Sequence, residues 1–379
     1  MSLYMIRIIL VLWAAGWASQ SVQAQSMLSP PSKKVADVLS LSSMQEQVAK
    51  ASMHAQQWAG PSSGPRATAG ATVAVISEDL HNGGILGVVK GITEAAKAIG
   101  WNVKVFNIGG TTAGRDVVFA AATALKPDGI ILVGMDAKES QTRLEAFRSQ
   151  NIAMVGWHVG PQAGVLADGP VAMNVSTDPL EVARITAMAA VVQAKGNAGV
   201  VIFTDSHFEI AKAKANAMAN VIKACKGCSL LEVKDVAISQ NAELMPATTR
   251  ELLGKYGKRW TYALAINDIY FDYAASELTK GGFSNTSINM MSAGDGSPAA
   301  FLRIQAGTFQ TATVAEPLNL HGWQLVDELN RLLAHQSVSG YLFPVHLVTT
   351  SNIAFDGGTQ LQYDPDNGYR DVYRRIWQR

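Results

Sequence analysis

The sequence is poor in charge and lacks the short motifs of several enzyme classes. Charged residues make up 16% of the 379 residues and the formal net charge is +1, which does not favour binding to nucleic acid or an anionic membrane. Residues 81–87, HNGGILG, lack the G-x-G-x-x-G spacing of dinucleotide sites, and the chain has no P-loop, no His-Glu-x-x-His and no G-x-S-x-G between a strand and a helix. We therefore expect that the protein is not an enzyme and that it binds no metal and no cofactor.

Long apolar runs are scarce, and the one at the N-terminus is short. Residues 1–7 carry one positive charge, residues 8–18 are apolar, and residues 22–24 (VQA) form a small-x-small cleavage site. A transmembrane anchor is the alternative, but a span needs about 20 apolar residues. We expect residues 1–24 to be a cleaved signal peptide and the mature protein to lie in the periplasm without membrane insertion.

Cysteine is almost absent. Cys225 and Cys228 are the only two, in the segment KACKGC at the end of a predicted helix. A redox-active pair more often opens a helix, where the thiolate is stabilised. In an oxidising compartment we favour a structural disulfide, with free or redox-active thiols as the alternative.

Residues 71–107 contain a β-α-β unit. Residues 72–76 form a β-branched apolar run typical of a strand buried on both faces. Residues 77–84 are polar and glycine-rich, and residues 85–99 have helical apolar spacing that ends at Gly100. Because the loop after the first strand lies at the carboxyl edge of the sheet, it lies where open α/β sheets bind ligands.

The same alternation continues through the chain and begins again near residue 180. Five strands are predicted up to residue 175, and a second series of strands and helices runs from residue 180 to residue 349. This order predicts an α/β protein with two doubly wound parallel-sheet lobes. Residues 25–70 precede the first strand as a helical extension and linker, which either packs on the first lobe or contacts a partner.

At this point the chain resembles the ribose-binding-like, type I periplasmic sugar-binding proteins of ABC transporters, over about residues 71–352. Separate segments match in order: 73–77 (VAVIS) with Lys90-Gly91; 127–133 (PDGIILV) with Asp136; Asn267-Asp268; 295–298 (DGSP) with Gly307 and 311–316 (TATVAE); and 343–350 (FPVHLVTT). Together the order and the spacing carry the resemblance.

The resemblance implies two lobes joined by a three-segment hinge, with crossings near residues 174–177, 313–317 and 345–350. The expected lobes are residues 71–175 plus 316–347, and residues 176–315 plus 348–379. Such a protein captures a sugar or polyol between its lobes as a monomer, closes at the hinge, and delivers the ligand to the membrane permease.

A sugar needs fixed hydrogen-bonding groups and an aromatic face. By resemblance, the residues at ligand positions are Asp136, Asn267, Asp295 and Glu316, with a helix cap or hinge salt bridge as the alternative for each. Lys212 falls near the family's ligand arginine, or is one more solvated helix lysine. The other strand-end candidates are His81, Asn82, Trp157 and His158, the last two with packing or structural roles as alternatives.

The sequence also departs from the ribose-binding pattern. Gly83, Gly84 and Ile85 stand where aromatic residues occur in ribose binders, and His158-Val159 replaces Asp-Arg. The range of expected ligands therefore includes polyols, modified sugars and furanosyl signalling molecules as well as pentoses and hexoses. A transcription regulator of the same fold would need an N-terminal helix-turn-helix; the remaining alternative is a periplasmic sensor component that presents ligand to a membrane receptor or kinase.

Overall fold

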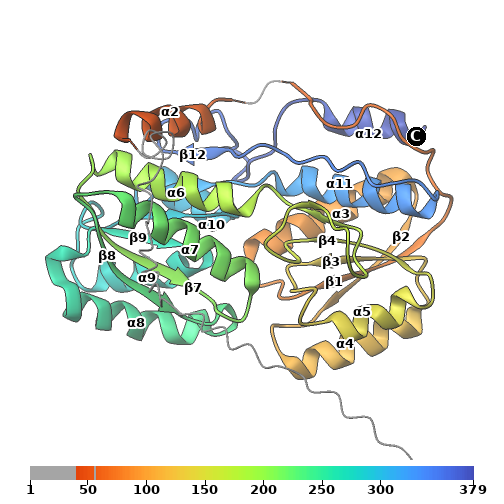
Figure 1. Ribbon diagram of the computed structural model, residues 1–379, viewed down its shortest axis with the longest axis horizontal. Helices are drawn as coiled ribbons and strands as arrows, with labels where there is room; N and C mark the ends of the chain where they lie inside the picture. The colour runs from red at the N-terminus through yellow and green to blue at the C-terminus, as the bar shows by residue number, and fades with distance from the viewer. Residues whose placement is uncertain (1–39, 55–56) are drawn as a thin grey trace, which may run out of the picture.

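The computed structural model of the protein describes residues 40–54 and 57–379 (Figure 1). The predicted signal peptide lies outside the described residues. Within those residues, no helix combines the length and the apolar character needed to cross a membrane.

The first lobe contains a six-stranded sheet in the order β2-β1-β3-β4-β6-β5. All pairs are parallel except β5 with β6, an antiparallel edge pair that was not predicted. The strands are β1 (Thr72–Ser77), β2 (Asn102–Asn107), β3 (Gly129–Val133), β4 (Ala153–Trp157), β5 (Gly164–Val165) and β6 (Met173–Val175).

The second lobe repeats this layout in a sheet of order β12-β11-β10-β9-β7-β8. Only the β11–β12 pair is antiparallel. The strands are β7 (Gly199–Thr204), β8 (Ser229–Asp235), β9 (Tyr262–Ala265), β10 (Asn289–Ser292), β11 (Gln310–Val314) and β12 (Leu347–Thr349). Two sheets of mostly parallel strands with flanking helices confirm the predicted α/β fold class.

Helices cover both faces of each sheet, which explains why the central strands are apolar throughout. In β1, residues Val73 to Ile76 are fully buried. α3 (Gly83–Ile99) begins at the Asn82 cap and ends at Gly100, whose φ of +87° favours glycine. The other first-lobe helices are α4 (Thr112–Leu125), α5 (Gln141–Arg148) and α11 (Leu318–Leu333); the second lobe has α6 (Pro179–Gln193), α7 (Glu209–Ala224), α8 (Asn241–Tyr256), α9 (Ile269–Lys280) and α10 (Pro298–Ala306), with short 3₁₀ turns at Ile238–Gln240 and Gly257–Arg259.

The C-terminal segment differs from the predicted lobe boundaries. β12 joins the second sheet, but α12 (Tyr369–Trp377) returns to the first lobe and packs against α3 and α11. Trp377 stacks on Trp323 of α11 with ring centroids 5.4 Å apart. We expected residues 348–379 to stay with the second lobe; the aromatic face of α12 instead buries itself in the first-lobe core.

The N-terminal extension crosses between the lobes. α2 (Leu41–Ala51) packs on α6 of the second lobe, and Figure 1 shows it on the same side of the molecule as α12. The segment after α2 reaches the first lobe, where Arg331 Nη2 donates to Ser63 O at 2.7 Å and Trp58 contacts Tyr373. The described part of the extension, residues 40–54 and 57–70, therefore packs on both lobes.

The packing of α2 predicts a stability effect. Met44 is 1% exposed and belongs to the second-lobe core, whereas Met53, just beyond the helix, is 69% exposed. Met44→Ala should lower the free energy of unfolding by about 2–5 kcal/mol through the cavity it leaves, measured by denaturant unfolding. Met53→Ala is the matched control and should change it by less than about 0.5 kcal/mol; equal effects of the two changes would contradict the packing of α2.

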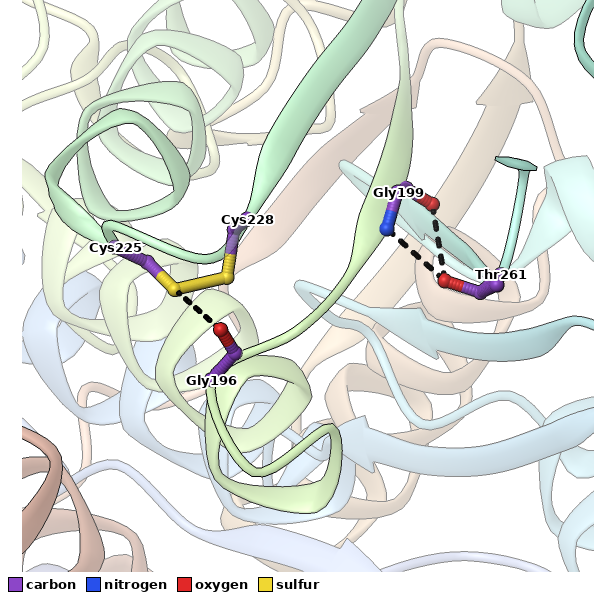
Figure 2. Close-up of a disulfide and its surroundings, with 5 residues drawn as sticks. All are labelled: Gly196, Gly199, Cys225, Cys228 and Thr261. Atoms are coloured by element: carbon purple, nitrogen blue, oxygen red, sulfur yellow. Dashed lines mark hydrogen bonds between the residues drawn. A yellow bond between two sulfur atoms is a disulfide. The ribbon is translucent and has the colours of Figure 1, made fainter.

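The two cysteines are joined by a disulfide in the turn between α7 and β8 (Figure 2). Cys225 Sγ also lies 3.4 Å from Gly196 O, in the loop before β7. The pair therefore lies at the amino end of the second sheet, away from the carboxyl edge where a ligand would bind.

Candidate functional site

The carboxyl edges of the two sheets face each other across a cavity of about 260 Å³. Loops after β1, β3 and β4 line it from the first lobe, and loops after β7, β9 and β10 line it from the second. Gly84 allows the lobes to approach at this point, since a Cβ on it would lie 2.2 Å from Asp295 Oδ2. The lobes are therefore in contact around the cavity, in a closed arrangement.

Five lining residues gather at the hinge side of the cavity, and we call them the inner cluster: Trp157, His158, Lys214, Asn267 and Asp295. Lys214 is 3% exposed, and its Nζ donates to Ala293 O at 2.8 Å. The Asn267 Oδ1 atom is buried without a hydrogen-bond partner among the described residues. Such groups are expensive to leave unpaired, so they suit a ligand that supplies hydrogen bonds.

Asp295 is the acidic member of the inner cluster. Burial raises its pKa to about 8, against the opposing effect of Lys214 and with a further increase from Glu316 and Asp268. No hydrogen-bond donor in residues 40–54 or 57–379 reaches its carboxylate. The side chain can therefore either donate as a neutral acid or accept from ligand hydroxyls once it ionises.

Asp268 fixes the Asp295 loop in place. Its Oδ2 accepts hydrogen bonds from the backbone N–H groups of Asp295, Gly296 and Ser297 at 2.8–3.0 Å. Its Oδ1 accepts from Gln310 Nε2 at 3.0 Å. Because both oxygens are used within the protein, Asp268 acts as a positioning residue for Asp295.

His158 and Glu316 connect the inner cluster to the hinge. The His158 ring stacks on Trp157 with centroids 3.6 Å apart, and its Nε2 lies 2.8 Å from Glu316 Oε1. Burial lowers the pKa of His158. Burial would raise the pKa of Glu316, but His158, His321 and Lys214 lower it overall. A neutral His158 that donates a hydrogen bond to an ionised Glu316 agrees with the lowered pKa of each residue.

The predicted site residues divide into two groups. The cavity is lined by five of them: Asn82, Trp157, His158, Asn267 and Asp295. Glu316 is not a lining residue, but it contacts His158. His81 and Lys212 lie elsewhere: the His81 side chain is 88% exposed beside Asp79, and Lys212 pairs with Glu209 on the surface of α7. Asp136 also does not line the cavity.

Asp136 instead links the two lobes. Its Oδ1 accepts from the backbone N–H of Lys138 in its own loop, and its Oδ2 accepts from Glu209 N, at the first turn of α7, at 3.1 Å. A carboxylate at a helix N-terminus satisfies an otherwise unpaired N–H group. The residue predicted as a ligand contact thus caps a helix across the cleft.

Several lining residues were not predicted from the sequence. Lys214 is the most informative, because it occupies the helix face of Ala211, Ala215 and Met218, all buried. A lysine at apolar helical spacing was the signal that could have identified it. The other titratable lining residues not predicted are Glu78, Asp79, Arg115, Glu139, Asp205 and His207, and Phe208 is an unpredicted aromatic one.

Solved structures with this arrangement include several binding proteins. An ABC transporter solute-binding protein from Agrobacterium vitis, bound with alpha-D-tagatopyranose, is 15% identical and covers 77% of this chain and 99% of its own, with a TM-score of 0.66. A second solute-binding protein from the same organism, with bound allitol, is 19% identical and covers 75% of this chain and 97% of its own, with a TM-score of 0.66. The Caulobacter myo-inositol binding protein, bound to myo-inositol, is 17% identical and covers 76% of this chain and 96% of its own, also with a TM-score of 0.66. At these identities the likeness concerns the fold.

A search of curated proteins finds no match. The family model described as periplasmic binding protein domain matches residues 73–337, well over half of the chain. That family comprises ligand-binding proteins, in agreement with the expectation that the chain is not an enzyme. The resemblance drawn from the order of its motifs is confirmed, and the chain belongs to the periplasmic binding protein domain family.

Proposed function

We propose that the protein is a periplasmic solute-binding protein that captures a sugar or sugar-like polyol between its lobes and delivers it to an ABC transporter permease. The observation that carries the proposal is the inner cluster, in which Asn267 Oδ1 is buried without a hydrogen-bond partner among the described residues and the buried side chains of Lys214 and Asp295 line the same cavity. Trp157 lines the same cavity. Hydroxyl groups around a small apolar ring match this combination of buried polar groups and an aromatic side chain.

The similar structures support the same chemical class. These structures hold tagatopyranose, allitol and myo-inositol as bound molecules, all of them neutral and rich in hydroxyls. Export through the predicted signal peptide would place this chain where such proteins act. We propose that it works there as a monomer, with lobe closure as the event that the permease recognises.

A thermal-shift screen of residues 25–379 against pentoses, hexoses, polyols and inositols tests the proposal. A ligand that binds only the folded state stabilises it by about 2.7 kcal/mol at a hundredfold excess over its dissociation constant. We expect one stereochemical class to raise the melting temperature clearly. If no member of the panel does so, while the protein itself unfolds cooperatively, the sugar-binding proposal is wrong.

The position of Asp136 predicts a loss of affinity without loss of a ligand contact. Asp136→Ala removes the cross-lobe cap on α7, so the closed form loses about 1 kcal/mol and ligand affinity falls about fivefold. Isothermal titration calorimetry measures the affinity, and small-angle scattering of the ligand-free protein should show a more open shape.

Asp128→Ala is the matched control for this change. Asp128 Oδ2 also accepts a backbone hydrogen bond, from Thr72 N at 2.7 Å, but entirely within the first lobe. It should lower stability and leave ligand affinity unchanged. A role for Asp136 in closure is contradicted if the two variants have the same affinity.

A further inference from the structure

A buried histidine outside the predicted site lies next to the inner cluster. His321 is in the first turn of α11, shortly after Glu316, and is fully buried. Its Nδ1 atom lies 3.2 Å from Nε1 of Trp157 and 3.4 Å from Oε2 of Glu316. Because His321 does not line the cavity, any effect that it has on a bound ligand passes through these neighbours.

His321 is neutral near pH 7, and its hydrogen is on Nε2. Burial lowers the pKa of His321 to about 4; Glu316 opposes this shift and His158 adds to it. The indole Nε1–H of Trp157 can only donate a hydrogen bond, so the Nδ1 atom that faces it is the acceptor. We assign the tautomer from this geometry. The Nε2–H group is then buried without a partner among residues 40–54 and 57–379.

This arrangement does not favour the packing of the core. A buried N–H group without a partner destabilises a protein, whereas an apolar side chain of similar size has no such cost. Leu318, Leu320 and Leu325 on the same helix are buried and apolar, and a leucine at position 321 would extend that surface. The acceptor that His321 offers to Trp157 therefore explains the histidine better than packing does.

The start of α11 and the crossing before it fix both rings of one stacked pair. Trp157 ends β4, and its ring stacks on that of His158 with centroids 3.6 Å apart. Glu316 Oε1 lies 2.8 Å from His158 Nε2, and His321 Nδ1 accepts from the Trp157 indole. Side chains of a binding site keep a defined orientation when neighbouring groups hold them by packing and hydrogen bonds.

We propose that His321 is a positioning residue of the ligand site, which holds the Trp157 indole, and with it the stacked His158 ring, in the orientation that receives a sugar or polyol. The inference rests on the proposed function, because it takes the inner cluster as the place where such a ligand binds. The orientation of the aromatic side of the site is then set by a residue outside the cavity.

The hydrogen bond is tested without any ligand, by nuclear magnetic resonance of residues 25–379 that carry isotope-labelled tryptophan. The Trp157 indole N–H should exchange slowly with solvent, and Trp157→Phe identifies its resonance. His321→Leu should shift this resonance and speed its exchange about tenfold or more. His321→Asn, whose Oδ1 takes the place of Nδ1, should keep most of the protection.

Trp260 is the internal reference for this measurement. Its Nε1 donates to Tyr262 O at 2.9 Å in the second lobe, so no change at His321 should alter its resonance. If the Trp157 resonance in His321→Leu matches that of the wild type, the hydrogen bond and the positioning role are both wrong.

Calorimetry tests the role in binding, with the pentoses, hexoses, polyols and inositols of the thermal-shift panel as probes, D-tagatose, allitol and myo-inositol among them. His321→Leu should weaken every probe that the wild type binds by about tenfold, and His321→Asn by less than about threefold. In a Trp157→Phe background His321→Leu should weaken binding no further, because the donor is already absent.

The double variant distinguishes positioning from a structural role. It removes both polar partners together, so its melting temperature should recover relative to His321→Leu. Its affinity should stay low, since no hydrogen bond holds the ring at position 157. Recovery of both the melting temperature and the affinity would show that His321 acts on stability alone.

The outcomes also separate the positioning role from the function. If a probe binds the wild type and His321→Leu with equal affinity, or if the leucine effect persists in the Trp157→Phe background, His321 does not position the site and the sugar-binding function stands. If no probe of the panel binds the wild-type protein, both proposals are wrong.

Discussion

Lys214→Met should abolish ligand binding. The Lys214 ammonium is buried between the Asp295 loop and the strand end at Ile266, and it donates to Ala293 O at 2.8 Å. It lies close enough to Asp295 and Glu316 to influence the pKa of both. Removal of a buried, hydrogen-bonded charge costs about 3 kcal/mol or more, which weakens binding on the order of a hundredfold.

Lys212→Met is a control on the same helix. The Lys212 side chain is 43% exposed and pairs with Glu209 outside the cavity. Exposed pairs of this kind contribute little, so affinity should change less than about twofold. Calorimetry gives both affinities, and the melting temperature of ligand-free Lys214→Met shows whether the variant is folded. A folded Lys214→Met variant with normal affinity would remove this residue from the site.

Ligand binding should release a proton and tighten as the pH rises towards 8. Burial raises the pKa of Asp295 to about 8 in the ligand-free protein, so the carboxyl is mostly neutral at pH 7. Hydroxyl groups that donate to the ionised form lower that pKa on binding. The complex therefore holds fewer protons than the free protein, and affinity rises by up to about tenfold per pH unit below pH 8 before it levels off.

The same shift has an opposite consequence for the empty protein. The folded-state pKa of about 8 lies above the ordinary aspartate pKa of 3.8, so at a pH between these two values the Asp295 carboxyl is ionised in the unfolded chain and mostly neutral in the folded protein. The contribution of Asp295 to stability is therefore lost progressively as the pH rises from about 4 to about 8. Lys214, Glu316 and Asp268 are the charged groups that act on Asp295, so their variants should alter this window.

Asp295→Asn separates this titration from others. The amide keeps the shape of the side chain but cannot ionise, so affinity should fall about tenfold at pH 8 and lose most of its pH dependence. Calorimetry in buffers of different ionisation enthalpy counts the protons released. Equal proton release by the wild type and the variant would assign the effect to another group, such as His158.

The sequence by itself determined the architecture and the edge at which the cavity forms. Apolar β-branched strands such as residues 72–76 alternate with helices, and parallel strands place their carboxyl ends together. Five of the nine predicted site residues consequently line the cavity, because their position after a strand is a local property of the chain.

Tertiary structure decided which side chains actually reach the cavity and which lobe the C-terminus joins. Lys212 and Lys214 are both lysines on α7, but the packing of the helix leaves Lys212 on the surface and buries Lys214. Asp136 follows a strand as predicted, yet the opposing lobe presents Glu209 N to it and makes it a cap. α12 joins the first lobe because Trp323 of α11, on which Trp377 stacks, already lies there. Each of these outcomes depends on contacts between segments distant in the chain, which local sequence pattern does not contain.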